Sequence, residues 1–90
     1  MATLRKGAIT PHVIADVVGQ GGLWTRQDIA RALGVPYSTH IKQQADLAYA
    51  YGFIEKFQGY SGTHRLAWLY APLGTMARLD DEYNAEVSGQ

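Results

Sequence analysis

The sequence predicts a single α+β domain in which three helices are followed by a β-hairpin. Apolar residues recur at helical spacing in three early segments, glycines and prolines separate those segments, and two later segments are rich in aromatic and branched residues. With 90 residues, 47% hydrophobic and 18% charged, the chain has the composition of one globular domain. We expect residues 10–72 to form this domain, residues 1–9 a flexible basic arm, and residues 73–90 an acidic tail.

Cap and glycine signals predict where the first two helices begin and end. Thr10 can cap free backbone N–H groups, and Pro11 follows at a position that needs no N–H donor. Thr25 and Asp28 resemble a capping box, and Gly34 supplies the left-handed conformation that ends the second helix. The predicted core residues of these two helices are Val13, Ile14, Val17, Val18, Ile29, Ala30 and Leu33.

The third helix is expected to run from Tyr37 or Ser38 to Tyr51, between Pro36 and Gly52. Its predicted buried side consists of Tyr37, Ile41, Ala45 and Ala48, with Leu47 and Tyr51 as further candidates. The opposite side presents short or flexible hydrogen-bonding groups with little apolar surface to hide, namely Ser38, Thr39, Lys42, Gln43 and Asp46. A polar face of this kind is either an ordinary solvated surface or a binding surface.

Residues 53–58 and 63–70 are predicted to form the hairpin, with the glycine-containing turn at residues 59–62. Leu23 and Trp24 form a short extended segment that can add an edge to this sheet. We interpret most of the aromatic residues as core and not as a base-stacking platform, specifically Trp24, Tyr49, Tyr51, Phe57 and Trp68.

Three segments carry a resemblance to a known family: Trp-Thr-Arg-Gln-Asp-Ile-Ala-Arg-Ala-Leu-Gly-Val at 24–35, Ser-Thr at 38–39, and Tyr-Gly-Phe-Ile-Glu-Lys at 51–56. With the order helix, short strand, helix, glycine turn, helix and hairpin, they resemble the winged helix-turn-helix superfamily of DNA-binding proteins. The resemblance covers residues 10–72. The chain departs from the usual pattern at Tyr37, where small residues are common, and at the turn 59–62, which has no basic residue.

The resemblance implies a small transcriptional regulator that binds double-stranded DNA and places its third helix in the major groove. In such folds the second helix of the pair contacts base edges, and the amino end of the first holds phosphate. The residues expected to contact DNA are Ser38, Thr39, Lys42, Gln43, Asp46, Arg26, Gln27, Tyr37, His64 and Arg65. For the hairpin two interpretations stay open, a DNA-contacting wing or an ordinary exposed hairpin.

Charge leaves a second function class open. The net charge is zero, but residues 1–72 carry +3 and residues 73–90 carry −3, so a locally basic body can still bind DNA. Arg5 and Lys6 form either an arm that follows the minor groove or merely solvated charge. Zero net charge and a weakly basic hairpin favour the alternative, a protein-interaction adaptor that does not bind DNA.

The tail carries apolar residues at spacings of three and four, which are Met76, Leu79, Tyr83 and Val87. A short amphipathic helix with this pattern can pack against a second copy as a homodimer or cover the domain's own sheet. Disorder is the third interpretation.

Several functional classes are not expected. The chain has no cysteine, and His12, His40 and His64 lie far apart, so we expect no metal site and a reducing, cytoplasmic setting. No set of nucleophile, base and orienting group and no phosphate-binding glycine motif is present, so we expect neither an enzyme nor a cofactor. The longest apolar run, 66–73, is too short to cross a membrane, and no export signal is expected.

Overall fold

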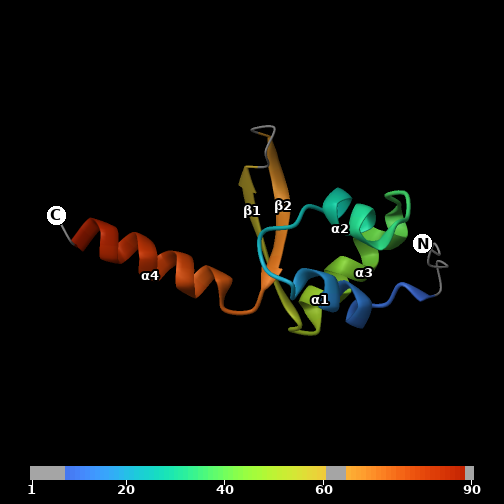
Figure 1. Ribbon diagram of the computed structural model, residues 1–90, viewed down its shortest axis with the longest axis horizontal. Helices are drawn as coiled ribbons and strands as arrows, with labels where there is room; N and C mark the ends of the chain where they lie inside the picture. The colour runs from blue at the N-terminus through green and yellow to red at the C-terminus, as the bar shows by residue number, and fades with distance from the viewer. Residues whose placement is uncertain (1–7, 61–64, 89–90) are drawn as a thin grey trace.

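The computed structural model describes the backbone of residues 8–60 and 65–88, and the side chains of residues 8–60 and 65–83. Within these residues the protein is a small α+β domain with four helices and a two-stranded antiparallel hairpin, as Figure 1 shows. The helices are α1 (Pro11–Val18), α2 (Arg26–Leu33), α3 (Thr39–Ala50) and α4 (Thr75–Ser88), and the strands are β1 (Ile54–Tyr60) and β2 (Leu66–Pro72). None of these helices combines the length and the apolar character that crossing a membrane requires.

The local signals at the helix ends are confirmed. Thr10 accepts a hydrogen bond from the Val13 N–H at 3.3 Å, and Thr25 and Asp28 form the reciprocal capping box. Gly34 has a φ of 72°, the left-handed conformation that glycine adopts without strain. These interactions satisfy backbone groups that no helical partner can reach, so they end the helices at defined residues.

The hairpin begins one residue later and extends further than predicted. β1 pairs with β2 from Ile54 opposite Pro72 to Tyr60 opposite Leu66, so residues 59 and 60 belong to the strand and not to the turn. Residues 61–64, including the predicted contact His64, lie outside the described residues. The expected edge segment is a single bridge in which Trp24 and Tyr70 exchange two backbone hydrogen bonds of 2.8 Å.

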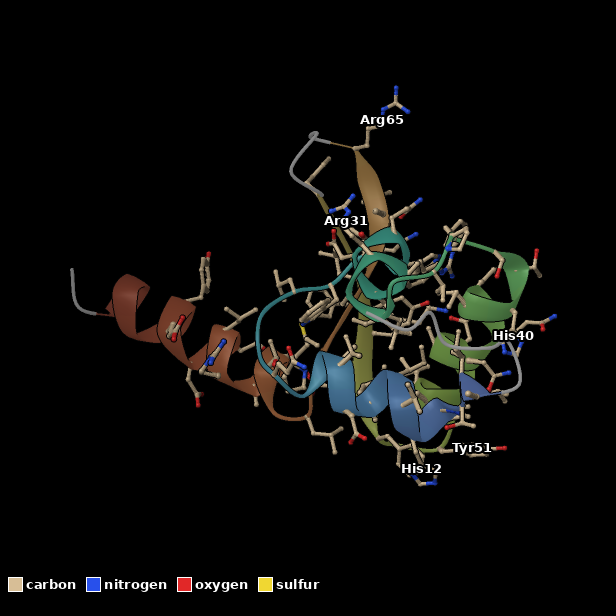
Figure 2. All side chains as sticks on the ribbon, turned by 45° about the vertical axis from the view of Figure 1, so that its right-hand side comes forward. His12, Arg31, His40, Tyr51 and Arg65 are labelled. Carbon is tan, nitrogen blue, oxygen red and sulfur yellow. The ribbon has the colours of Figure 1, made fainter. Side chains whose placement is uncertain are left out.

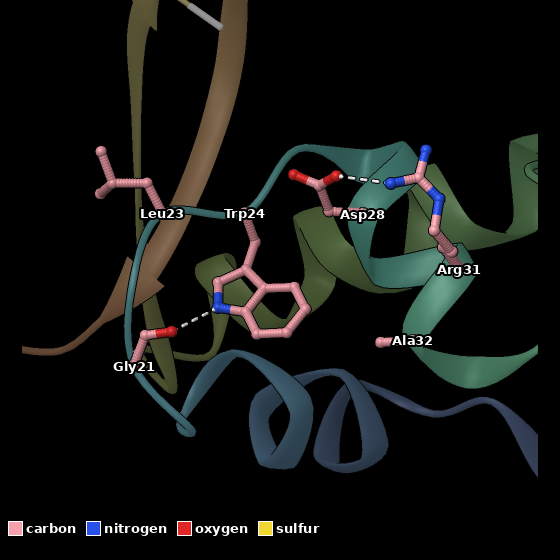
Figure 3. A pocket seen from close by; sticks show the side chains of 6 residues that line it. All are labelled: Gly21, Leu23, Trp24, Asp28, Arg31 and Ala32. Carbon is pink, nitrogen blue, oxygen red and sulfur yellow. Dashed lines mark hydrogen bonds and ion pairs between the residues drawn. The ribbon is translucent and has the colours of Figure 1, made fainter. Parts of the chain in front are cut away.

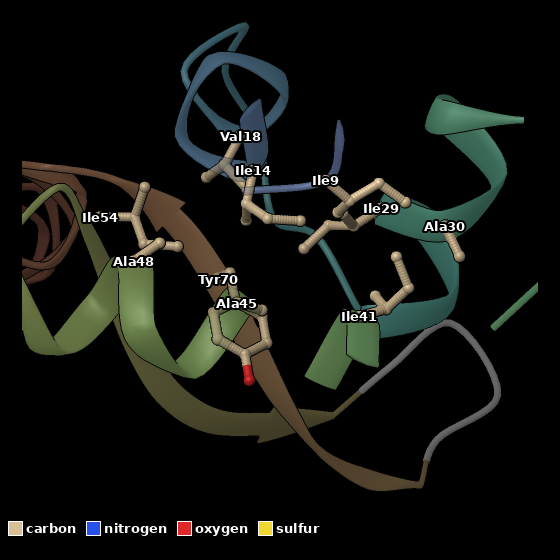
Figure 4. Close-up of a cluster of buried hydrophobic side chains, with 10 residues drawn as sticks. All are labelled: Ile9, Ile14, Val18, Ile29, Ala30, Ile41, Ala45, Ala48, Ile54 and Tyr70. Carbon is tan, nitrogen blue, oxygen red and sulfur yellow. The ribbon is translucent and has the colours of Figure 1, made fainter. Parts of the chain in front are cut away.

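The core joins α1, α2 and α3 to the hairpin, as Figure 4 shows. Its buried members are Ile9, Ile14, Val18, Ile29, Ala30, Ile41, Ala45, Ala48, Ile54 and Tyr70. The predicted inward faces of α1 and α2 are confirmed, with Val13 and Leu33 only partly buried. Ile9 is 4% exposed, so the packed domain includes a residue that the sequence assigned to a flexible arm.

Several residues predicted to be buried are exposed. The buried stripe of α3 is limited to Ile41, Ala45 and Ala48, which lie at helical spacing on one side. The apolar face of α3 is narrow. Residues one position away from the buried stripe therefore face solvent, and so do residues beyond the helix ends. The corrected residues are Tyr37, Leu47, Tyr49 and Tyr51 on or beside α3, and Trp68 on β2.

The tail forms α4, which extends away from the three-helix body in Figure 1. Its start is attached to the hairpin by Glu55, whose carboxylate accepts the N–H groups of Gly74 at 2.9 Å and Met76 at 2.8 Å. Met76, Leu79 and Tyr83 are exposed. For the described side chains, the interpretation that the tail covers the domain's own sheet is therefore wrong, because α4 leaves the sheet after its first turn.

Candidate nucleic-acid interface

An exposed polar ridge runs along the amino-terminal half of α3. Ser38 precedes the helix, and Thr39, Lys42 and Gln43 follow at spacings that place them on its outer side. All four side chains are exposed. We call these four residues the α3 ridge, and the structure brings them together as the sequence predicted.

The connection between α2 and α3 holds the ridge in position. Directly after Gly34, the Val35 N–H donates to the Ala30 carbonyl at 3.0 Å, and Val35 packs against the core. On the inner side of α3, His40 has a ring nitrogen 3.2 Å from the Ile9 carbonyl oxygen. These contacts tie the α2–α3 connection and the start of α3 to the rest of the domain. The ridge is therefore a rigid surface and not a loop.

Four side chains from α2, α3, β1 and β2 form a connected cluster beside the ridge. The Tyr70 hydroxyl donates to Asp46 Oδ1 at 2.6 Å, and Lys56 Nζ lies 2.9 Å from the same oxygen. Arg26 donates from Nε to the Tyr70 hydroxyl at 3.0 Å and has Nη2 3.6 Å from Asp46 Oδ1. We call Arg26, Asp46, Lys56 and Tyr70 the Asp46 cluster.

The surroundings of the cluster favour its ionised groups. Partial burial raises the pKa of Asp46, but hydrogen bonds from Tyr70 and Lys56 and the charges of Lys56 and Arg26 outweigh burial, so the pKa lies below its ordinary value of 3.8. Burial raises the pKa of Tyr70, and its hydrogen bond to Asp46 raises it further. Burial opposes the charge of Arg26, yet Tyr70 and Asp46 raise its pKa overall. Asp46 is therefore a carboxylate, and Tyr70 keeps its proton.

Acid is expected to weaken the fold through Asp46. A carboxyl whose pKa is lower in the folded than in the unfolded state stabilises the fold above its unfolded value, and this contribution disappears as pH falls through the folded value. The difference in free energy of unfolding between wild type and Asp46→Asn should be constant at neutral pH and shrink once pH falls below 3.8. Urea unfolding at a series of pH values measures it. A difference that grows on acidification would contradict this assignment.

Aromatic rings surround the ammonium group of Lys56. Lys56 Nζ lies 4.4 Å from the ring centroid of Trp68, 5.9 Å from that of Tyr49 and 6.0 Å from that of Tyr70. Cation–π attraction in this range adds to the ion pair with Asp46. The exposed rings of Trp68 and Tyr49 therefore lie within cation–π range of the Lys56 ammonium group.

The remaining predicted contacts divide between two places. Arg26, Gln27 and Tyr37 lie together in a shallow depression between the start of α2 and β2, which is also lined by Thr25, Leu66, Ala67 and Trp68. Arg65 is exposed at the far end of the hairpin, as Figure 2 shows. Of the ten predicted residues, four form the α3 ridge and three line the depression, whereas Asp46 contacts internal partners and Arg65 lies apart. The tenth, His64, lies outside the described residues.

A second depression lies between the α1–α2 connection and α2, and its polar groups are already paired, so we do not treat it as a candidate site. Figure 3 shows its polar groups bonded to one another: Trp24 Nε1 donates to the Gly21 carbonyl at 2.9 Å, and Arg31 pairs with Asp28 at 3.4 Å. Across the described residues, no buried side-chain nitrogen or oxygen lacks a partner, and no group of three or more His, Asp or Glu side chains is placed to hold a metal ion.

Lys56 and Tyr70 are the members of the Asp46 cluster that sequence reasoning missed. The sequence placed both only within the strands of the predicted hairpin, residues 53–58 and 63–70. Their pairing opposite one another in the hairpin register is the signal that joins them, and the sequence left that register open.

Comparisons with protein-family models, curated proteins and solved structures find no match for this chain. We therefore infer its function from the ridge and its surroundings.

Proposed function

We propose that this protein is a small DNA-binding regulator of the winged helix-turn-helix type, which reads the major groove of duplex DNA with α3 and has no catalytic function. The single observation that carries the proposal is the exposed α3 ridge, backed by the buried residues Ile41 and Ala45 and joined to α2 by the Gly34 turn. The proposed place of action is the cytoplasm. The hairpin would be its wing.

The dimensions of α3 suit this function. Its 12 residues span about 18 Å in length at 1.5 Å per residue. The major groove of B-DNA is about 12 Å wide, and this width admits one helix. Gln43 can pair with both acceptor and donor of an adenine edge, and Lys42 can donate to guanine or phosphate. Ser38 and Thr39 suit base or phosphate contacts at the start of the helix. Gln27 and Arg26 flank the same surface from α2.

A homodimer belongs to the proposal. Two α3 helices about 34 Å apart would enter successive major grooves on one side of the duplex. The exposed apolar residues Met76, Leu79 and Tyr83 support α4 as the contact between copies. A helix of 14 residues is marginal in water by itself, so packing against a second copy would stabilise it.

Amide chemical shifts recorded while a random-sequence duplex is added at low salt test the proposal. We expect the largest shifts at residues 38–43, smaller ones at Arg26 and Gln27, and none at the exposed residues His12 and Asp16 of α1. Raising the salt concentration should reverse the shifts, because phosphate contacts release counterions. An unchanged spectrum, or shifts that leave residues 38–43 unaffected, would refute the proposal.

The alternative is an interaction adaptor, and the exposed apolar side of α4 is the observation that favours it. In that case the duplex would leave the spectrum unchanged at low salt. A defined protein partner would instead shift the amides of residues 75–83. The duplex titration therefore separates the two functions at low salt.

A further inference from the structure

Two hydrogen-bond donors and one further cation meet at one oxygen of Asp46, as such groups do at a phosphate oxygen. Tyr70 is fully buried, and its hydroxyl is the closest donor, at 2.6 Å. The ammonium group of Lys56 and the guanidinium group of Arg26 complete the set at 2.9 Å and 3.6 Å. Charge-assisted donors of these types are the ones that bind nucleic-acid phosphates in proteins. The carboxylate of Asp46 therefore occupies a site suited to a phosphate.

This site adjoins the α3 ridge. Asp46 follows Lys42 by four residues and Gln43 by three, which places it one helical turn further along the same helix. A duplex seated on the ridge brings its backbone past this turn. Asp46 is one-third exposed, so a phosphate can approach it from solvent.

The two cations of the site are withdrawn from DNA in the observed arrangement. The side chains of Arg26 and Lys56 are only 18% and 16% exposed, and both pair with the Asp46 carboxylate. The single carboxylate offsets one of the two positive charges while it engages both cations. Counterion release depends on cations that reach phosphates, so these two contribute less to affinity while Asp46 holds them.

We propose that Asp46 limits the affinity of the ridge for duplex DNA, because its carboxylate fills a phosphate site formed by Arg26, Tyr70 and Lys56. This inference rests on the proposed DNA-binding function and gives Asp46 a role opposite to a base contact. Removing the carboxylate frees the site for one backbone phosphate. The affinity limit keeps non-specific binding weak and makes the complex depend on the contacts of Lys42 and Gln43.

Duplex titration of wild type and Asp46→Ala, which empties the site that the carboxylate fills, over a range of salt concentrations tests the inference. The logarithm of the binding constant falls by about 0.9 per phosphate contact for each tenfold rise in salt. One added contact should steepen the slope by about 1 and tighten binding roughly five- to tenfold near 0.1 M salt. Asp16→Ala on α1 is the control, since it changes the net charge equally at an exposed position away from the site. Asp46→Glu, which keeps a carboxylate, should retain the wild-type slope.

Lys56→Gln distinguishes freed cations from the mere loss of a repulsive charge. If Asp46 acts by holding Lys56, this substitution lowers affinity more in the Asp46→Ala background than in wild type, a coupling that a double-mutant cycle measures. Equal effects in both backgrounds, or equal slopes for Asp46→Ala and Asp16→Ala, would overturn the inference while leaving the proposed function intact. If neither wild type nor Asp46→Ala binds the duplex at low salt, both proposals fail. Thermal unfolding of each variant verifies that the compared proteins are folded.

Discussion

Replacement of Tyr70 by alanine is expected to lower the free energy of unfolding by about 3–5 kcal/mol, a large part of the stability of so small a domain. Among the described residues, Tyr70 is the largest fully buried side chain, and it lies in the core cluster shared by α1, α2 and α3. Its ring fills the space between these helices and β2. Its hydroxyl also satisfies Asp46 and accepts from Arg26, so truncation removes packing and hydrogen bonds together.

Two further variants separate these contributions. Tyr70→Phe keeps the ring and removes only the hydroxyl, and we expect a loss of about 1–3 kcal/mol because Asp46 loses its shortest hydrogen bond. Tyr60→Ala is the matched control, since Tyr60 is 74% exposed on the same hairpin and should change stability by at most about 0.5 kcal/mol. Urea unfolding measures all three. A Tyr70→Ala protein as stable as Tyr60→Ala would contradict the packing described above.

The parts of the fold that sequence predicted are those set by local interactions. Thr10 and Thr25 cap backbone groups three residues away, and Gly34 ends α2 through its own backbone conformation. The buried faces of α1 and α2 follow from helical spacing alone. Such signals involve neighbours in the chain, so they can be read without knowing how the elements pack.

The Asp46 cluster could not be predicted in the same way. Arg26 and Tyr70 are 44 residues apart, and Asp46 meets Tyr70 across 24 residues. Their contact depends on the hairpin register and on the angle between α3 and the sheet, which no local pattern determines. The sequence placed Asp46 correctly beside the ridge, yet its partners follow only from the tertiary arrangement.

The boundaries of the domain show the same limit of local sequence patterns. Ile9 resembles a residue of the N-terminal arm until the structure shows it buried against α3, where its carbonyl also meets His40. Glu55 resembles ordinary surface charge until β1 and the start of α4 are seen side by side. In both cases one long-range contact decides the role of a residue with no distinctive local pattern.

Substitution of the ridge is expected to have the largest effect on DNA binding. With a duplex selected from a random pool for tight binding to wild type, Gln43→Ala should weaken binding by about 1–3 kcal/mol and relax the preference at one base position. Lys42→Ala should weaken binding to all duplexes and reduce the salt slope by about 1, because it removes one phosphate contact. Competition with duplexes changed one base pair at a time measures both effects.

Two matched controls test whether these effects are specific to the α3 ridge. Arg78→Ala removes one positive charge from α4, and Gln20→Ala removes one exposed amide from the α1–α2 connection. Neither residue belongs to the α3 ridge, so neither change should alter base preference or reduce the salt slope as Lys42→Ala does. If Arg78→Ala weakens binding as much as Lys42→Ala, general charge and not the ridge governs the interaction. A loss confined to Lys42 and Gln43 places recognition on α3, because only a helix seated in the groove joins a salt-dependent contact and a base-dependent contact at adjacent residues.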